Sequence, residues 1–320
     1  MRLATIDLSG RPAAAAILPD GSAVVFDAAA SSSGAVLAPV IWAAIASGDL
    51  QQVITAGPAA LEALQRFVDG ASAEEVSGAI HPAGSVRLLA PLPRPAKNVF
   101  CVGRNYAEHI AEGDRAQNIK VGVSERPVFF TKPATAVVGP GATVPIFPHV
   151  STHIDYEVEL AVVIGKPGRD IPPEKAFEHI YGYTIVNDIT ARDVQRRHGG
   201  QYFKGKGLDG SCPMGPWIVT ADALPDPQRI GLRLWVNGAK RQDGNTAAMI
   251  FDIPTLIASL SEGLTLEPGD VLATGTPSGV GYAMDPPQFL KDGDVVVCEI
   301  DGIGRLENTV ASVGSARQVA

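Results

Sequence analysis

The chain has 320 residues and a formal net charge of −8, with 46% hydrophobic and 19% charged residues. This hydrophobic content excludes a disordered chain, and the acidic balance gives no reason to expect nucleic acid or an anionic membrane as a partner. At roughly 150 residues per domain, the length suggests two units, or one large domain with an appendage. The chain has three cysteines, Cys101, Cys212 and Cys298, which are far apart. We therefore expect no disulfides and no thiolate zinc site, and a reducing compartment fits this pattern.

The N-terminus does not resemble a signal peptide, because Asp7 interrupts it before an apolar segment forms. The longest nearly uncharged stretch, around residues 35–47, contains Pro39 and is shorter than the roughly 20 apolar residues that a membrane span needs. We therefore expect a soluble, cytoplasmic protein.

The first 87 residues are expected to form a small α+β domain. Alternating polar and apolar residues at the N-terminus predict two strands, and a Pro-Asp-Gly turn separates them from a third. Two helical segments follow, and the second is opened by a proline and closed by a glycine. The clearest predicted elements are strands over residues 2–8 and 22–26 and helices near 35–47 and 58–69.

A proline-rich run separates this domain from the rest of the chain. Residues 88–95 contain three prolines, which neither a helix nor a central strand can accommodate. We predict that residues 88–96 form a linker and that residues 97–320 form a second, larger domain.

The second domain is predicted to be rich in strands. Strands outnumber helices there and do not alternate with them, which disfavours a doubly wound parallel sheet and favours a β-rich α+β fold with a few helices on its rim. The predicted strands cover residues 99–102, 127–131, 157–164, 183–188, 218–220, 232–236, 270–274 and 295–300, and the predicted helices cover 107–112, 173–180 and 254–261.

Two carboxylates stand at the start of a predicted buried strand. Alternation places Glu157 and Glu159 on one face, and the strand continues with four apolar residues in a row, 161–164. A strand that is apolar on both faces is buried, so like charges at its rim need a cation. The alternative interpretation is an ordinary solvated strand face.

A third carboxylate follows another β-branched run, which ends in Asn187 and Asp188. Asp188 either caps the following turn or completes a three-carboxylate site with Glu157 and Glu159. Three oxygen ligands without His or Cys favour Mg²⁺ or Mn²⁺ over Zn²⁺.

Two further segments offer groups for proton transfer and for binding. His109 and Glu112 are three residues apart on a short predicted helix, so the carboxylate can orient the imidazole as a general base; such pairs are also common on surface helices. Lys206 lies among glycines and either reaches a ligand or is a solvated loop lysine. The Gly/Thr/Ser loop over residues 273–281 presents backbone N–H groups that suit a carboxylate.

Six ordered motifs resemble the fumarylacetoacetate hydrolase family over about residues 88–310. They are Gly-Arg-Asn-Tyr-x-x-His at 103–109, Asp-Tyr-Glu-Val-Glu-Leu at 155–160, Asn-Asp-x-x-Ala-Arg-Asp-x-Gln at 187–195, Lys-Gly-Lys-Gly to Cys-Pro-x-Gly-Pro at 204–216, Gly-Asn-Thr at 244–246, and Pro-Gly-Asp-Val-x-x-Thr-Gly-Thr-Pro at 268–277. The chain departs from many members at Gly207, where they have a serine.

The resemblance implies a mixed β-sandwich roll, a homodimer, and one Mg²⁺ or Mn²⁺ held by Glu157, Glu159 and Asp188. It also implies that His109 and Glu112 belong to a mobile lid. The substrate site would be lined by Arg104, Arg192, Gln195, Lys206 and Thr276.

Members of this family cleave or rearrange 2-oxo and 2,4-dioxo acids, so two activities are expected on this scaffold. The first is metal-dependent hydrolysis of a C–C bond in an acylpyruvate, fumarylpyruvate or diketo-sugar acid, with His109 activating water and Lys206 stabilising the oxyanion. The second is decarboxylation or isomerisation of a 2-oxo acid such as oxaloacetate, which needs no activated water. A metal-stabilised binding module without catalysis is a third, less favoured interpretation, because the acidic ligands and the His–Glu pair are all present.

Overall fold

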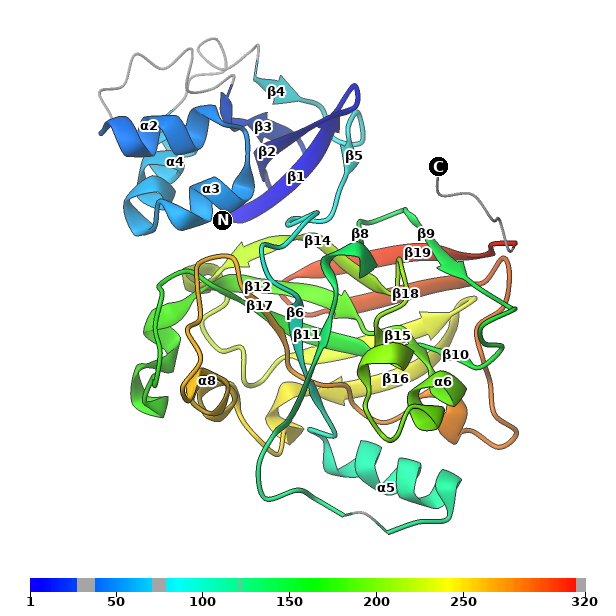
Figure 1. The fold of residues 1–320 in the computed structure, drawn as a ribbon. Helices are drawn as coiled ribbons and strands as arrows, with labels where there is room; N and C mark the ends of the chain where they lie inside the picture. The colour runs from blue at the N-terminus through cyan, green and yellow to red at the C-terminus, as the bar shows by residue number, and fades with distance from the viewer. Residues whose placement is uncertain (28–37, 71–78, 121, 315–320) are drawn as a thin grey trace.

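Two packed sheets form the framework of the protein in the computed structural model, which describes residues 1–27, 38–70, 79–120 and 122–314 (Figure 1). One sheet has 12 strands, mainly in the order β4-β3-β2-β1-β14-β12-β11-β17-β6-β7, and the other has five, in the order β16-β15-β18-β19-β9. Both contain parallel and antiparallel pairs. The fold is therefore α+β and rich in strands, as the sequence predicts.

The N-terminal unit contains the predicted strands and helices. Its elements are β1 (Arg2–Leu8), β2 (Arg11–Ile17), β3 (Ala23–Val25), β4 (Ile80–His81), β5 (Arg87–Leu88), α2 (Pro39–Ala46), α3 (Leu50–Thr55) and α4 (Pro58–Gly70). The helix expected near 35–47 is α2, although residues 35–37 lie outside the described part of the chain. Helix α3 was not predicted; it begins where Asp49 accepts a hydrogen bond from the Gln51 N–H at 2.9 Å.

The N-terminal strands continue the sheet of the larger unit. Strand β1 pairs antiparallel with β14 (Cys212–Thr220), with Leu3 opposite Ile218. One hydrophobic cluster contains residues of both units, and Ala90 and Leu92 of the proline-rich segment are buried in it. The segment is irregular after Leu88, and the division into two domains stays a prediction.

The larger unit is a sandwich whose core lies between the two sheets. The elements that complete the larger sheet are β6 (Val99–Gly103), β7 (Val128–Lys132), β8 (Val137–Val138), β11 (Val158–Ile164), β12 (Ile180–Asn187) and β17 (Val271–Ala273). The smaller sheet consists of β9 (Thr143–Ile146), β15 (Gly231–Val236), β16 (Ala239–Asn245), β18 (Val295–Ile300) and β19 (Gly304–Ser312), and β10 (Ile154–Asp155) pairs with β13 (Thr190–Ala191). Leu160 of β11, Leu234 of β15 and Cys298 of β18 pack in one cluster, which joins the sheets.

The helices of the larger unit differ most from the prediction. Helix α5 (Ala107–Gln117) runs beyond the predicted end at residue 112, because Gly113 continues it and Asn118, at φ 53°, ends it in the left-handed conformation. Residues Pro173–His179 form a 3-10 helix rather than an α-helix. The helix expected at 254–261 is α8 (Ile253–Ser261), while α6 (Arg192–Arg197) and α7 (Phe203–Lys206) were not predicted.

Strands that contain proline or strongly polar sequence also escaped prediction. Strand β14 was expected only over residues 218–220. Pro213 and Pro216 lie in its first half and interrupt the strand pattern there. Strands β16 and β19 carry charged side chains toward solvent. Within the described residues, no helix is long and apolar enough to cross a membrane.

Candidate active site

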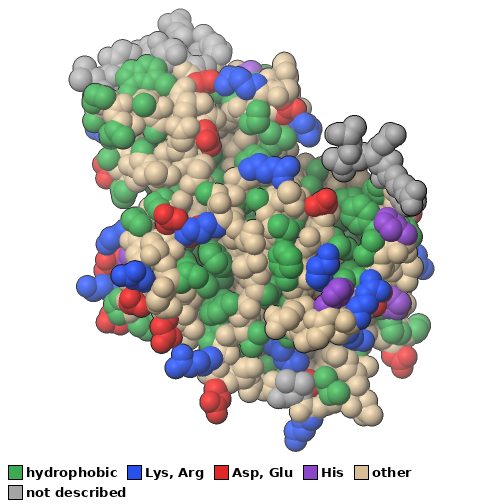
Figure 2. All heavy atoms as spheres, in the orientation of Figure 1, with side chains coloured by type: hydrophobic (Ala, Val, Ile, Leu, Met, Phe, Trp, Pro, Cys, Tyr) green, Lys and Arg blue, Asp and Glu red, His purple; other side chains and the backbone are tan. Residues whose placement is uncertain are grey.

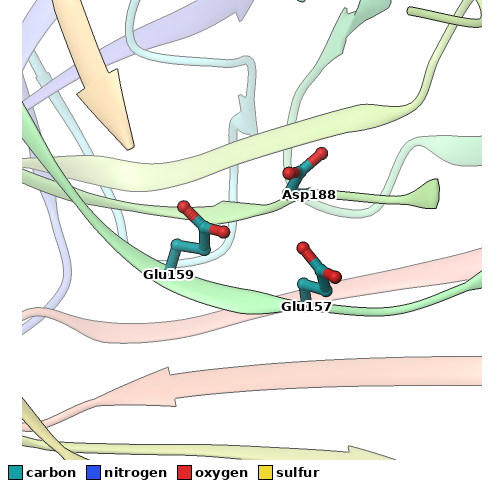
Figure 3. A group of neighbouring side chains, drawn as sticks. All are labelled: Glu157, Glu159 and Asp188. Atoms are coloured by element: carbon teal, nitrogen blue, oxygen red, sulfur yellow. The ribbon is translucent and has the colours of Figure 1, made fainter. Parts of the chain in front are cut away.

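Three buried carboxylates meet where β11 and β12 lie side by side (Figure 3). Glu157 precedes β11, Glu159 lies within it, and Asp188 follows β12. The Asp188 N–H donates to the Glu157 carbonyl at 2.8 Å, which fixes the two strand ends together. The three side chains are at most 3% exposed, and one ligand oxygen from each lies within 4.8 Å of the others. The solvated-face interpretation of Glu157 and Glu159 is therefore wrong.

Opposite charges surround Glu157. Its Oε2 lies 2.7 Å from Lys206 Nζ and its Oε1 lies 2.7 Å from Arg192 Nη2. Burial alone would raise the pKa of this carboxyl, but the two cations hold the pKa of Glu157 well below its usual range. Glu157 is consequently ionised.

Glu159 has a different environment. Its Oε2 accepts a hydrogen bond from the Gly275 N–H at 2.8 Å, and none of the ion pairs found between described residues involves it. Burial, together with repulsion from Asp188 and Glu157, raises the pKa of Glu159 well above its usual range. A divalent cation between the three carboxylates would balance this charge, so the donor set fits Mg²⁺ or Mn²⁺.

Two lysines hold Asp188 in place. Lys132 Nζ lies 2.7 Å from Asp188 Oδ1, and Lys206 Nζ lies 2.6 Å from Oδ2. Burial favours a neutral amine, but Asp188 and Glu157 outweigh it and raise the pKa of Lys206. Lys132 also donates to the carbonyls of Ile189 and Lys206. The solvated-loop interpretation of Lys206 is wrong, since it ends α7 and is 3% exposed.

The His109–Glu112 pair forms on one face of α5, as its spacing predicts. His109 Nδ1 lies 2.9 Å from Glu112 Oε1, and Glu112 Oε2 accepts the Gly279 N–H at 2.9 Å. The carboxylate partner assigns the proton of the imidazole to Nδ1, which leaves Nε2 as the hydrogen-bond acceptor. His109 is 9% exposed, so the pair is not part of an ordinary solvated helix face.

One cavity of about 450 Å³ brings most of the predicted residues together. Eight of the ten line it: Arg104, His109, Glu157, Glu159, Arg192, Gln195, Lys206 and Thr276. The other two, Glu112 and Asp188, contact lining residues, namely His109 and Lys206. The side chains of Phe130, Tyr202 and Tyr282 add aromatic walls.

Several lining residues are already engaged in contacts within the protein. The Arg192 guanidinium donates to Asp155 Oδ2 at 2.9 Å and stacks 4.3 Å from the centre of the Tyr282 ring. The Thr276 hydroxyl donates to the Val158 carbonyl at 2.9 Å. Arg104, at φ 60°, pairs with Asp114 at 3.0 Å.

Lys132, Asp155 and Tyr282 also belong to this site, and none of them was predicted. Asp155 is fully buried and accepts hydrogen bonds from the backbone N–H groups of Gly281 at 2.7 Å and Tyr282 at 3.1 Å. It therefore joins the loop that contains Gly281 and Tyr282 to Arg192. The alternation Asp155, Glu157, Glu159 could have indicated it. Nothing in the sequence singles out Lys132, because its partner Asp188 is 56 residues away along the chain.

Comparisons with known proteins agree with this architecture. The fumarylacetoacetate hydrolase C-terminal domain matches residues 98–311. The oxaloacetate tautomerase YisK of Bacillus subtilis is 47% identical over 74% of this chain and 77% of its own length, and the mitochondrial oxaloacetate tautomerase fahd2 of Xenopus laevis is 46% identical over 71% and 69%. A maleylpyruvate hydrolase of Sphingobium sp. SYK-6, solved with manganese(II) and pyruvate, is 30% identical and superposes with a TM-score of 0.73 over 98% of this chain and 99% of that one. The chain therefore belongs to the fumarylacetoacetate hydrolase family, which its motifs resemble.

Proposed function

We propose that the protein catalyses the keto–enol tautomerisation of oxaloacetate or a closely related 2-oxo acid. The observation that carries the proposal is that His109, paired with Glu112, lines the same cavity as Glu157 and Glu159 of the buried carboxylate triad. Two relatives that are 47% and 46% identical over the aligned part of the chain are oxaloacetate tautomerases, and this favours isomerisation over hydrolysis, which is the first expectation from the sequence motifs alone.

Glu157, Glu159 and Asp188 are the residues that would hold the divalent cation. When bound there, it supplies a Lewis acid that polarises the 2-oxo group and acidifies the neighbouring C3–H bond. Lys206 contributes a second, fixed positive charge beside the triad, close to where negative charge develops on the oxygen.

His109 moves the proton in this scheme. Its Nε2 accepts the proton from C3 while Glu112 stabilises the imidazolium through Nδ1. The same imidazolium then returns the proton to the oxygen at C2. The proton lost by carbon is the proton gained by oxygen, so the reaction consumes neither water nor a second substrate.

The dyad alone does not distinguish tautomerisation from hydrolysis. In the sequence, His109 and Glu112 favour the activation of water, but an imidazole base removes a proton from carbon as well as from water. Hydrolysis is the second candidate, since the maleylpyruvate hydrolase shares the fold at 30% identity.

The test follows the conversion of enol-oxaloacetate to the keto form by ultraviolet absorbance, with Mg²⁺ and with EDTA. We expect a protein-dependent acceleration that EDTA abolishes and that His109→Ala reduces. Release of pyruvate from maleylpyruvate or acylpyruvates is measured in parallel. Rapid pyruvate release without acceleration of tautomerisation would reject the proposal in favour of the hydrolase.

A further inference from the structure

The cations that line the cavity are not equivalent. Arg104 pairs with Asp114, Arg192 pairs with Asp155 and Glu157, and Lys206 pairs with Glu157 and Asp188. Arg196 is the exception. It lines the same cavity, yet within the described ranges no carboxylate forms an ion pair with it.

Arg196 lies one helical turn beyond Arg192 on α6, so both side chains project from the same face of the helix. Both guanidinium groups lie over the Tyr282 ring, at 4.3 Å from its centre for Arg192 and 5.5 Å for Arg196. Arg192 contacts Glu157 of the triad at 2.7 Å, whereas no ion pair found between described residues joins Arg196 to a triad carboxylate.

The surroundings of Arg196 are open and positive. It is exposed, as are Arg197 and His198 after it. Figure 2 shows Lys, Arg and His side chains gathered on the surface where Figure 1 places α6. An anion that enters the cavity therefore meets an unneutralised guanidinium before it reaches the paired charges.

We propose that Arg196 binds the distal carboxylate of the substrate and thereby selects 2-oxo dicarboxylates over 2-oxo monocarboxylates. The inference rests on the proposed function, in which the 2-oxo group lies at the triad end of the cavity; the adjacent C1 carboxylate would then lie there as well. A four-carbon diacid then has one carboxylate left over. A planar guanidinium recognises a carboxylate through two parallel N–H bonds, and the guanidinium of Arg196 lies 5.5 Å from the centre of the Tyr282 ring, within the cavity wall.

Two unreactive probes isolate this carboxylate. Malate and 2-hydroxybutanoate have the same carbon chain and the same chelating end, and they differ only in whether carbon 4 is a carboxylate or a methyl group. Each is titrated calorimetrically into the Mg²⁺-loaded protein. The variants are Arg196→Gln and, as a matched control from the same helix, Arg197→Gln. Arg197 donates to the Val150 carbonyl at 3.0 Å and does not line the cavity.

We expect Arg196→Gln to weaken malate binding about 10-fold, because it removes a charged hydrogen bond at a partly solvated site, and to change 2-hydroxybutanoate binding less than about twofold. Arg196→Lys should retain part of the preference, since it keeps the charge without the fork. Equal effects on both probes, no effect on either, or the same loss in Arg197→Gln would overturn the inference.

Activity separates this inference from the proposed function. In Arg196→Gln we expect the KM for oxaloacetate to rise by a similar factor with little change in kcat. If the wild-type protein prefers malate through Arg196 but does not interconvert the oxaloacetate tautomers, the proposed tautomerase activity fails and the carboxylate site stands. If it interconverts them and the malate preference survives Arg196→Gln, the site fails and the activity stands.

Discussion

Glu157 and Glu159 lie two residues apart on the same strand face, but their surroundings predict opposite effects of the same substitution in the absence of metal. The ionised form of Glu157 is stabilised by Lys206 and Arg192, so its pKa is lowered. Glu159 is buried near two other carboxylates, so its pKa is raised. We expect Glu157→Gln to destabilise the metal-free protein and Glu159→Gln to stabilise it.

The magnitudes follow from these contacts. Glu157→Gln loses two charged pairs, but Lys206 keeps Asp188 and Arg192 keeps Asp155, so the cost is about 2 kcal/mol, less than that of a buried pair left uncompensated. Glu159→Gln removes a carboxyl that is costly to bury and keeps an acceptor for the Gly275 N–H, a gain of about 1–2 kcal/mol.

These energies convert to melting temperatures through the size of the chain. An unfolding entropy of about 2.1 cal/mol/K per residue amounts to about 0.67 kcal/mol/K for 320 residues. In EDTA, we therefore expect Tm to fall by about 3 °C in Glu157→Gln and to rise by about 2 °C in Glu159→Gln. Mg²⁺ at 100 times its Kd stabilises the wild-type protein by about 2.7 kcal/mol and should raise its Tm by about 4 °C. The Tm of either variant should rise less, because each variant lacks one carboxylate of the triad.

Scanning calorimetry in EDTA and in Mg²⁺ measures all three proteins. The matched control is Glu299→Gln, a surface strand glutamate that is expected to change stability by less than about 0.5 kcal/mol. Since the folded-state pKa of Glu159 is raised, its destabilising effect grows as pH rises above the usual value of 4.5 and vanishes below it. A loss of Tm in metal-free Glu159→Gln as large as in Glu157→Gln would refute this electrostatic reasoning.

Further substitutions test three parts of the site around the triad: the His109–Glu112 pair, the contact of α5 with Tyr282, and Lys132. His109→Ala is expected to lower kcat about 10²–10⁴-fold and Glu112→Gln less, with calorimetric Mg²⁺ affinity unchanged in both; wild-type kcat would reject the dyad. In Gly113→Ala, the new Cβ would lie 2.4 Å from Tyr282 Oη, so α5 must shift and kcat should fall, whereas adding Tyr282→Phe should restore part of it; a lack of rescue would contradict this contact. Lys132→Met is expected to lower Tm by about 4–7 °C, because breaking a buried ion pair costs about 3–5 kcal/mol, and a change below 1 °C, about 0.7 kcal/mol, would refute that role.

Local sequence pattern was sufficient to locate the triad. The apolar run of β11 shows that the strand is buried on both faces, and alternation then places Glu157 and Glu159 together. Asp188 follows from the end of β12, whose β-branched residues indicate a strand. His109 and Glu112 follow from helical spacing alone.

Pattern failed where long-range contacts determine the structure. Helices α6 and α7 are six and four residues long, and their glycine and charged residues give no helical hydrophobic pattern. Tertiary packing positions these short helices beside the cavity. The burial of Lys206 depends on carboxylates from two strands, which helical or strand periodicity cannot reveal. The three-dimensional structure is needed to see which charges form ion pairs. Only then is it clear that Arg196 forms no ion pair with a carboxylate among the described residues.

The pairing of β1 with β14 also covers a strand edge of the kind that favours aggregation when it is left open. Where Ile218 and Val219 face β1, the backbone of β14 would otherwise be an open edge beside a hydrophobic sheet. Such an edge is a template for strands of other chains. Removing residues 1–87 would uncover this edge. A shortened chain would then be prone to self-association although it keeps every site residue. The N-terminal strands therefore serve the larger unit by covering its edge.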